Sequence, residues 1–263
     1  MLQPVVECDI KDDIAFIRLN RPNVGNAMNQ EFADTILEIA TVCANDSRLR
    51  AVLITGNGKV FSVGGDISAF NSASAEELPD KLTRMAIPYH EAVRTFARLD
   101  VPIVTAVHGA CAGGGMGLLF PADVALAAEG TKFATGFGLI GIPGDAGNSW
   151  YLPRLIGVRR AAEMYFESRV IYADTAAEWG LITRVVAKDA LFGEAETVVR
   201  KLAAGPTKCY GAMRQLLRDS WTNTVSEHLG AETDALRRIS ASADAPAAIA
   251  SFMNKRQPVF EGK

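Results

Sequence analysis

Two glycine-rich segments constrain the fold of this chain more than any other feature. They occupy residues 61–66 (FSVGGD) and 108–117 (HGACAGGGMG), and each follows an apolar run, at 51–55 and 103–107, that predicts a buried strand. Because glycine has no Cβ, the backbone at such turns can approach a ligand closely and point its N–H groups outward. Two N–H groups that face one carbonyl oxygen would form an oxyanion hole.

Composition and charge indicate an ordinary globular protein and exclude several classes of partner. The 263 residues are 49% hydrophobic and 22% charged, which is enough for one sizeable core. A net charge of −3 and a pI near 5.7 provide no general attraction to nucleic acid or to an anionic membrane. We therefore expect no nucleic-acid partner and no membrane partner.

Targeting and metal-binding patterns are absent from the sequence. No apolar stretch approaches the roughly 18 residues of a membrane span, and the start of the chain lacks the features of a secretory signal. The four cysteines are widely spread and the three histidines lie far apart, so no disulfide framework or metal site is expected. A cytoplasmic location follows as the expectation, with Cys111 interpreted as a small packing residue.

The order of predicted elements divides the chain into two regions. Strands and helices alternate to about residue 190, with strands expected at 14–19, 124–127 and 184–186 and helices at 29–44 and 85–99. Helical patterns alone follow, at about 190–204, 206–220, 224–240 and 244–254. This order predicts an α/β fold with a core at 1–195 and a C-terminal helical region at 196–263.

The glycine segments fit other glycine motifs poorly. Neither is GxGxxG, and no βαβ unit with a downstream ribose-binding acid is clear. The GxxxxGK pattern of a P-loop is also absent. Tight packing turns and a pair of backbone donors at strand-to-helix turns remain as the two interpretations.

Several motifs in order resemble the crotonase (enoyl-CoA hydratase/isomerase) superfamily over nearly the whole chain. They are 19–22 (LNRP), 26–29 (NAMN), 61–66, 113–115 (GGG), 147–154 (GNSWYLPR), 176–181 (AAEWGL) and 255–260 (KRQPVF). The resemblance implies a spiral of ββα turns and a C-terminal helical region that drives assembly into a homotrimer or a dimer of trimers. It also implies an acyl-CoA thioester as ligand, with CoA entering as part of the substrate and no separate cofactor or metal.

The same resemblance implies roles for individual residues. The N–H groups of Gly65 and Gly114 would hold the thioester oxygen. Residues implied to contact CoA are Ala27, Val63, Gly64, Asp66 and Ile67, and His90 is a further candidate through the dehalogenase branch. From their apolar character, Met85, Met116, Phe137 and Leu139 are candidate walls of an acyl pocket, or equally core residues. From their residue types, Asp66 and Asp123 are also expected to anchor their turns, and Trp150 and Trp179 to lie in the core.

The carboxylates decide which reaction the resemblance implies. Hydratases of the superfamily use two glutamates, at positions held here by Gly117 and Phe137, so both are missing. Asp145 lies where isomerases of the superfamily carry a single acid, and the closest pattern is the phenylacetate-pathway and Δ3,Δ2-enoyl-CoA isomerase group. The opposing interpretation is that Asp145 caps the helix expected near Gly147.

An isomerase is therefore the favoured activity, with Asp145 as the general base of an enolate reaction. Three alternatives stay open: an enoyl-CoA hydratase, an aryl-CoA dehalogenase-like hydrolase, and a catalytically silent acyl-CoA binder. In the dehalogenase branch a helix histidine, here His90, works beside the aspartate. A partly buried, non-catalytic His90 is preferred over that role.

Overall fold

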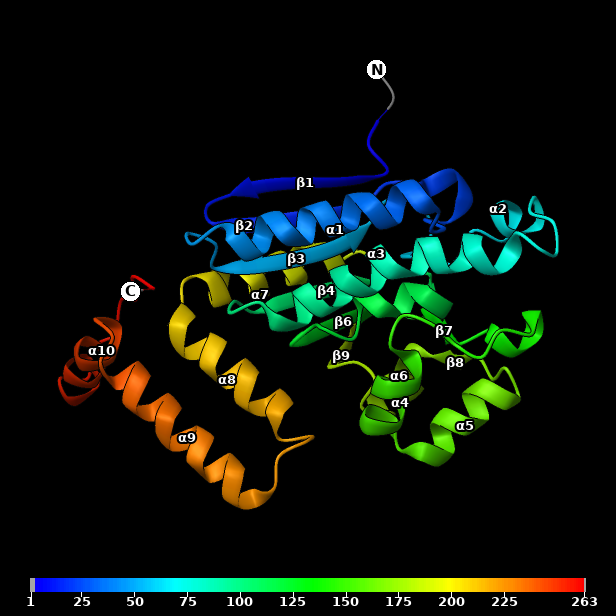
Figure 1. Cartoon of the computed structure of the whole chain (residues 1–263). Coiled ribbons are helices and arrows are strands. Elements are labelled where there is room, and N and C mark those ends of the chain that lie inside the picture. The colour runs from blue at the N-terminus through cyan, green and yellow to red at the C-terminus, as the bar shows by residue number, and fades with distance from the viewer. Residues whose placement is uncertain (1–2, 263) are drawn as a thin grey trace.

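The computed structural model describes residues 3–262, and a six-stranded sheet forms its centre (Figure 1). The strands run in the order β1-β2-β3-β4-β6-β9, with only the β1–β2 pair antiparallel. Their bounds are β1 Val6–Lys11, β2 Ile14–Leu19, β3 Ala51–Gly56, β4 Ile103–Val107, β6 Val124–Ala128 and β9 Arg184–Val186. The parallel strands are joined by crossovers that carry the helices.

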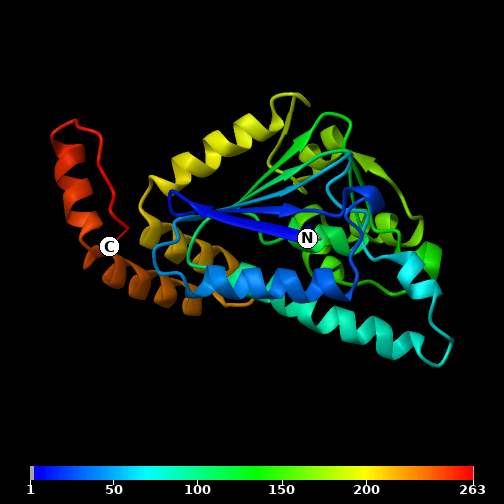
Figure 2. The same cartoon turned by 90° about the horizontal axis from the view of Figure 1, so that it is seen from above.

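Helices cover both faces of this sheet, as Figure 2 shows. Alternation along β3 explains why: Val52 and Ile54 face one apolar cluster, and Leu53 faces another. The first cluster includes α1 (Gln30–Asn45) and α3 (Leu78–Arg98), and the second includes α7 (Leu191–Ala203). The expected boundary at 195/196 thus falls inside α7, while the division into two regions stays a prediction.

A second, smaller sheet lies beside the first and gives the fold its repeat of two strands and a helix. It consists of β5 (Ala110–Ala112), β7 (Lys132–Ala134) and β8 (Ile171–Tyr172), in that order. Short helical elements follow these strands and carry the candidate site. They are η2 (Gly113–Leu118), η3 (Phe137–Ile140), α4 (Asn148–Ile156), α5 (Val158–Phe166) and α6 (Ala173–Trp179), together with η1 (Pro22–Val24) and α2 (Ile67–Asn71) nearer the N-terminus.

The C-terminal helices extend to one side of the core (Figure 1). They are α8 (Thr207–Asp219), α9 (Val225–Ser240) and α10 (Asp244–Met253). Arg214, only 4% exposed, fixes α8 to the core through the carbonyl oxygens of Val101, Phe96 and Pro121. Its guanidinium also pairs with Asp123 at 3.1 Å, and burial lowers the Arg214 pKa to about 10.

The mixed α/β fold expected from the sequence is confirmed, and most element predictions agree with the structure to within two residues. The exceptions have local causes. α3 starts at Leu78, seven residues before the expected position, because its polar first turn lacks apolar periodicity. Trp150 is 39% exposed and therefore not a core residue; it packs at the surface against Trp221 and Arg154.

Candidate functional site

Backbone pairing brings the two glycine segments side by side. Ser62 donates its N–H to Ala110 O at 3.1 Å, and Ala112 donates its N–H to Ser62 O at 2.9 Å. The turns that follow are in contact, because a Cβ added to Gly64 would lie 3.3 Å from the nitrogen of Gly114. Within residues 3–262, neither the Gly65 N–H nor the Gly114 N–H donates to another residue. Two unengaged amide donors therefore lie at one place.

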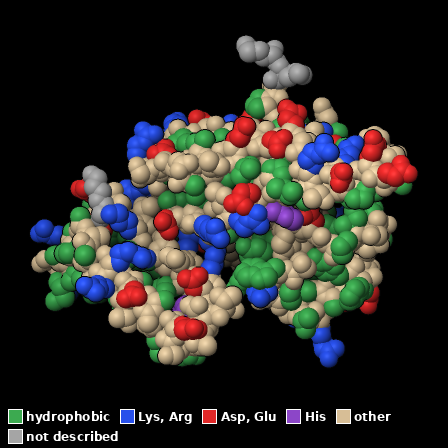
Figure 3. Space-filling model, in the orientation of Figure 1, with side chains coloured by type: hydrophobic (Ala, Val, Ile, Leu, Met, Phe, Trp, Pro, Cys, Tyr) green, Lys and Arg blue, Asp and Glu red, His purple; other side chains and the backbone are tan. Residues whose placement is uncertain are grey.

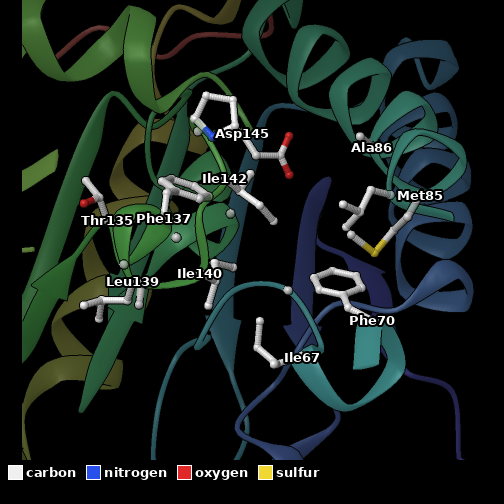
Figure 4. A pocket seen from close by; sticks show the side chains of 18 of the residues that line it. Ile67, Phe70, Met85, Ala86, Thr135, Phe137, Leu139, Ile140, Ile142 and Asp145 are labelled. Atoms are coloured by element: carbon white, nitrogen blue, oxygen red, sulfur yellow. The ribbon is translucent and has the colours of Figure 1, made fainter. Parts of the chain in front are cut away.

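These donors open onto a cavity of about 550 Å³ with a largely apolar lining (Figure 4). The α3 wall contributes Met85, the η3 wall contributes Phe137 and Leu139, and α2 contributes Ile67 and Phe70. The remaining lining residues are Val63, Gly65, Leu82, Thr83, Ala86, Ile87, His90, Ala112, Gly113, Gly114, Thr135, Gly136, Ile140, Ile142, Pro143, Gly144 and Asp145. Such a lining suits an apolar organic group with a few polar anchors.

A strained loop delivers Asp145 to this cavity. Its neighbours Gly144, Ala146 and Gly147 have φ angles of +125°, +55° and +80°, in the region that favours glycine. Ala146 keeps this conformation at a cost of about 1 kcal/mol or more, a feature often found at functional sites. The loop ends where α4 begins at Asn148, and no side chain caps that helix, so Asp145 does not act as its cap.

The two oxygens of Asp145 have different surroundings. Oδ1 accepts the Ala146 N–H at 2.7 Å and contacts His90 Nε2. Oδ2 faces Gly114, where an added Cβ would lie 3.7 Å away, and it has no hydrogen-bond partner among the described residues. The side chain is 23% exposed. One oxygen thus anchors the carboxylate while the other remains available beside the glycine turn.

Helix α3 presents two adjacent residues to this region. His90 contacts Asp145, while Tyr89 donates its hydroxyl to Gly114 O at 2.8 Å. Burial raises the pKa of Tyr89 well above its ordinary value, with the charge of Asp145 adding to the effect. Tyr89 therefore stays a neutral donor that fixes the Gly114 carbonyl.

Neither position of the expected glutamate pair can supply an acid. A Cβ added at Gly117 would meet Ala146 Cβ at 2.8 Å and Tyr89 Oη at 2.9 Å, which leaves no room for a side chain. Phe137 stacks on Tyr165 at a ring distance of 5.9 Å. Of the cavity-lining residues in the described part of the chain, Asp145 alone carries a carboxylate.

The structure brings together nine of the residues expected from the sequence. They are Val63, Gly65, Ile67, Met85, His90, Gly114, Phe137, Leu139 and Asp145, and all line the cavity.

Four expected residues lie outside that lining. Met116 is fully buried in the core, because η2 turns it inward. The Asp66 carboxylate accepts hydrogen bonds from the Ala69 N–H, in the first turn of α2, and from the Arg21 guanidinium. Ala27 is buried with its carbonyl held by Arg21, and Gly64 packs on Ala112.

Sequence reasoning missed two residues that hold the site together, Tyr89 and Asn148. Tyr89 falls on the helical stripe that continues from Met85, and this periodicity places it on the inner face of α3. Asn148 is fully buried, and its side chain bonds Gly113 O at 3.0 Å and Asp145 O at 2.8 Å. No sequence pattern distinguishes it from an exposed polar residue in the first turn of a helix.

Residues 3–262 contain no group of three or more His, Cys, Asp or Glu side chains placed to hold a metal ion. No helix in the same range has the length and apolar character needed to cross a membrane.

Comparison with known proteins defines the family. Residues 9–263 match the enoyl-CoA hydratase/isomerase family. The chain is 33% identical to 1,2-epoxyphenylacetyl-CoA isomerase of Escherichia coli (strain K12), with 97% of each protein covered. It is 32% identical to 4-chlorobenzoyl coenzyme A dehalogenase-2 of Arthrobacter sp, over 81% of this chain and 78% of that protein.

A solved Mycobacterium abscessus structure, assigned as an enoyl-CoA hydratase/isomerase, superimposes with a TM-score of 0.93. It is 34% identical to this chain, and the match covers 98% of this chain and 100% of that one. Fold and sequence agree over nearly the full length of both proteins. The chain belongs to the enoyl-CoA hydratase/isomerase family.

Proposed function

We propose that this protein is an enoyl-CoA isomerase that moves a double bond in an acyl-CoA thioester. The observation that carries the proposal is the single carboxylate, Asp145, in an apolar cavity beside two unengaged amide donors, Gly65 and Gly114. The similarity to 1,2-epoxyphenylacetyl-CoA isomerase supports an isomerase on a CoA thioester, although the two substrates need not be the same. Water addition, in contrast, lacks the second carboxylate in this cavity.

The proposed mechanism uses one proton and leaves the substrate composition unchanged. The thioester oxygen accepts hydrogen bonds from the Gly65 and Gly114 N–H groups. Asp145 Oδ2 removes a proton from the carbon next to the double bond, and the electron pair moves onto the thioester as a dienolate. The two amides stabilise the oxygen charge, for which one such donor typically contributes about 10²–10³ in rate. Protonated Asp145 then returns the proton two carbons away, and the double bond is left in its new position.

The pairing of His90 with Asp145 fits this cycle. With Oδ1 held by the Ala146 N–H and by His90, the carboxylate cannot rotate freely. Its free oxygen keeps one orientation during both proton transfers. Holding the reacting atoms in one geometry removes part of the entropic cost of the step.

The test is a panel of 2-enoyl-, 3-enoyl- and aryl-CoA thioesters, followed by mass and ultraviolet absorbance. Double-bond migration together with α-proton exchange in D₂O is the expected result. Asp145→Asn should lower the isomerisation rate by about 10²–10⁴-fold, the usual contribution of a general base, while acyl-CoA still binds. Glu91→Gln is the matched control, because this half-exposed carboxylate lies on α3 next to His90 and, among the described residues, pairs only with Arg94.

Three outcomes would contradict the proposal. Full isomerase activity in the Asp145→Asn protein would show that Asp145 is not the general base. Rapid hydration of crotonyl-CoA without bond migration would favour the hydratase. Thioester binding with neither migration nor α-proton exchange would favour a catalytically silent acyl-CoA binder.

The direct contact of His90 with Asp145 also supports a second candidate, hydrolytic dehalogenation of an aryl-CoA thioester. Here the Asp145 carboxylate would attack the ring carbon that bears the halogen, and halide would leave. Water activated by His90 would then hydrolyse the resulting aryl ester. With 4-chlorobenzoyl-CoA, His90→Ala should accumulate a covalent adduct that intact-protein mass spectrometry detects. The isomerase reading predicts no adduct.

A further inference from the structure

The buried Asn148 side chain connects the two halves of the site. Its Nδ2 donates to Gly113 O at 3.0 Å and to Asp145 O at 2.8 Å. The side chain is fully buried, and its Oδ1 has no partner among the described residues. A buried oxygen without a hydrogen-bond partner destabilises the fold. At this position the NH₂ group of the Asn148 side chain is satisfied by two acceptors, whereas its oxygen is not satisfied. The two donated hydrogen bonds are therefore the feature of the side chain that the surrounding structure uses.

Both acceptors of Asn148 belong to peptide units that face the cavity. The Gly113 carbonyl and the Gly114 N–H are opposite ends of one planar peptide, so a bond that holds the oxygen also fixes the direction of the N–H. The Asp145 carbonyl and the Ala146 N–H form a second such unit, and that N–H holds Asp145 Oδ1 at 2.7 Å. One side chain therefore sets the orientation of both peptides.

We infer that Asn148 is a positioning residue that aligns the Gly114 oxyanion donor with the Asp145 carboxylate. This inference rests on the proposed function. Donation to Gly113 O also polarises the peptide, which makes the Gly114 N–H a stronger donor to a thioester oxygen. Tyr89 fixes the next carbonyl, Gly114 O, from α3, so the Gly114 residue is held on both sides.

The experiment measures the thioester carbonyl directly. Benzoyl-CoA with ¹³C in its carbonyl has no α-proton and no halogen on its ring, so neither proposed reaction can proceed and the bound thioester stays intact. In the wild type, binding should lower the C=O stretching frequency, because the two amides polarise the bond. In Asn148→Ala at least half of that shift should be lost. In the isomerase assay kcat should fall about 10- to 100-fold, less than the 10²–10³ expected for removing a donor outright, with KM within about threefold.

Two further variants separate positioning from folding. Asn148→Asp keeps the volume of the side chain and removes its NH₂ group, so it should show the same loss without creating a cavity. Thr105→Val is the matched control, since Thr105 is also fully buried and donates to Leu118 O at 3.2 Å, at the far end of η2. This control should keep both the carbonyl shift and kcat.

The possible failures are distinguishable. If the wild-type carbonyl band does not move on binding, the oxyanion hole itself is wrong and the proposed function falls together with this inference. If the wild-type band moves and a folded Asn148 variant keeps the full shift and the full kcat, only the role of Asn148 is overturned. A matching loss in Thr105→Val would also overturn it, because any buried donor to η2 would then suffice.

Discussion

Ala146 lies directly against Gly117, so that a Cβ at Gly117 would be 2.8 Å from the Ala146 methyl group. This contact closes the space that a carboxylate at position 117 would need, and the residue that closes it is the neighbour of Asp145. The loop that brings Asp145 into the cavity therefore also excludes a second acid at position 117. The geometry favours chemistry with a single carboxylate.

Gly117→Glu should therefore fail to create hydratase activity. Because the new side chain overlaps Ala146 and Tyr89, we expect the free energy of unfolding to fall by about 1–3 kcal/mol. Urea unfolding measures the stability, and crotonyl-CoA hydration measures the activity. Gly193→Ala is the control, since nothing lies within 4 Å of an added Cβ in α7 and the change should be neutral or stabilising. A stable Gly117→Glu protein that hydrates crotonyl-CoA would show that the loop carrying Asp145 and Ala146 can move to admit the new side chain.

Asp123→Ala should destabilise the fold strongly. Asp123 accepts the Ile103 N–H at 2.7 Å and pairs with the buried Arg214, so its removal leaves the buried guanidinium without its paired carboxylate. A loss of about 3–5 kcal/mol is expected in urea unfolding. Glu196→Ala breaks the exposed Glu196–Arg200 pair instead and should change stability by at most about 1 kcal/mol. Equal effects of the two variants would mean that the buried pair is not needed to hold α8.

The start of α9 should weaken in acid. Thr224 and Glu227 form a capping box, and the backbone and hydroxyl of Thr224 hold the pKa of Glu227 below its ordinary value of 4.5. A carboxyl with a lowered pKa in the folded state contributes its stability above pH 4.5, and that contribution is lost as pH falls through the folded pKa. The protection factors of the amides in the first turn of α9 against hydrogen exchange, which correct for the intrinsic pH dependence, should therefore fall below pH 4.5. In Glu227→Gln this step should disappear, and a step that persists would assign the acid sensitivity to another group.

We predict that the protein forms a homotrimer or a dimer of trimers through its C-terminal helices. Large apolar side chains are exposed there, and Figure 3 shows hydrophobic groups over α9 and α10. Leu236, Phe252 and Met253 are exposed by 72%, 80% and 76%. Exposed apolar surface of this kind often marks an interface. Phe252→Asp combined with Leu236→Asp should yield monomers in light scattering after size exclusion.

The control for that experiment is Phe166→Asp, because Phe166 is 87% exposed but ends α5, away from these helices. It should leave the assembly unchanged. A wild-type protein that is monomeric at micromolar concentration would refute the prediction.

Much of the fold could be predicted from the sequence, because apolar period and glycine turns are local signals. The run at 51–55 and the stripe in α1 carry their own pattern, and the structure places both in the core. β5, β7 and β8 escaped prediction because each has only two or three residues, too few for a period. These strands form because segments distant in the sequence pair with one another, and a local sequence pattern carries no information about such pairing.

The site was only partly predictable for the same reason. Asp145, Gly65 and Gly114 stand in recognisable motifs, and they do line one cavity. The bonds from Tyr89 and Asn148 join segments 25 and 35 residues apart, so their significance appears only in three dimensions. Met116 follows the same glycine run but turns into the core, because the tight 3₁₀ turn of η2 determines which side chains face the ligand.

The unequal surroundings of the two Asp145 oxygens have a stereochemical consequence. With Oδ1 occupied by His90 and the Ala146 N–H, only Oδ2 can exchange hydrogen with a bound thioester. In the proposed isomerisation, removal and return of the proton would then take place on one side of the planar dienolate, so we predict a suprafacial shift. A deuterium label at the donor carbon would be carried in part to the acceptor carbon of the same molecule.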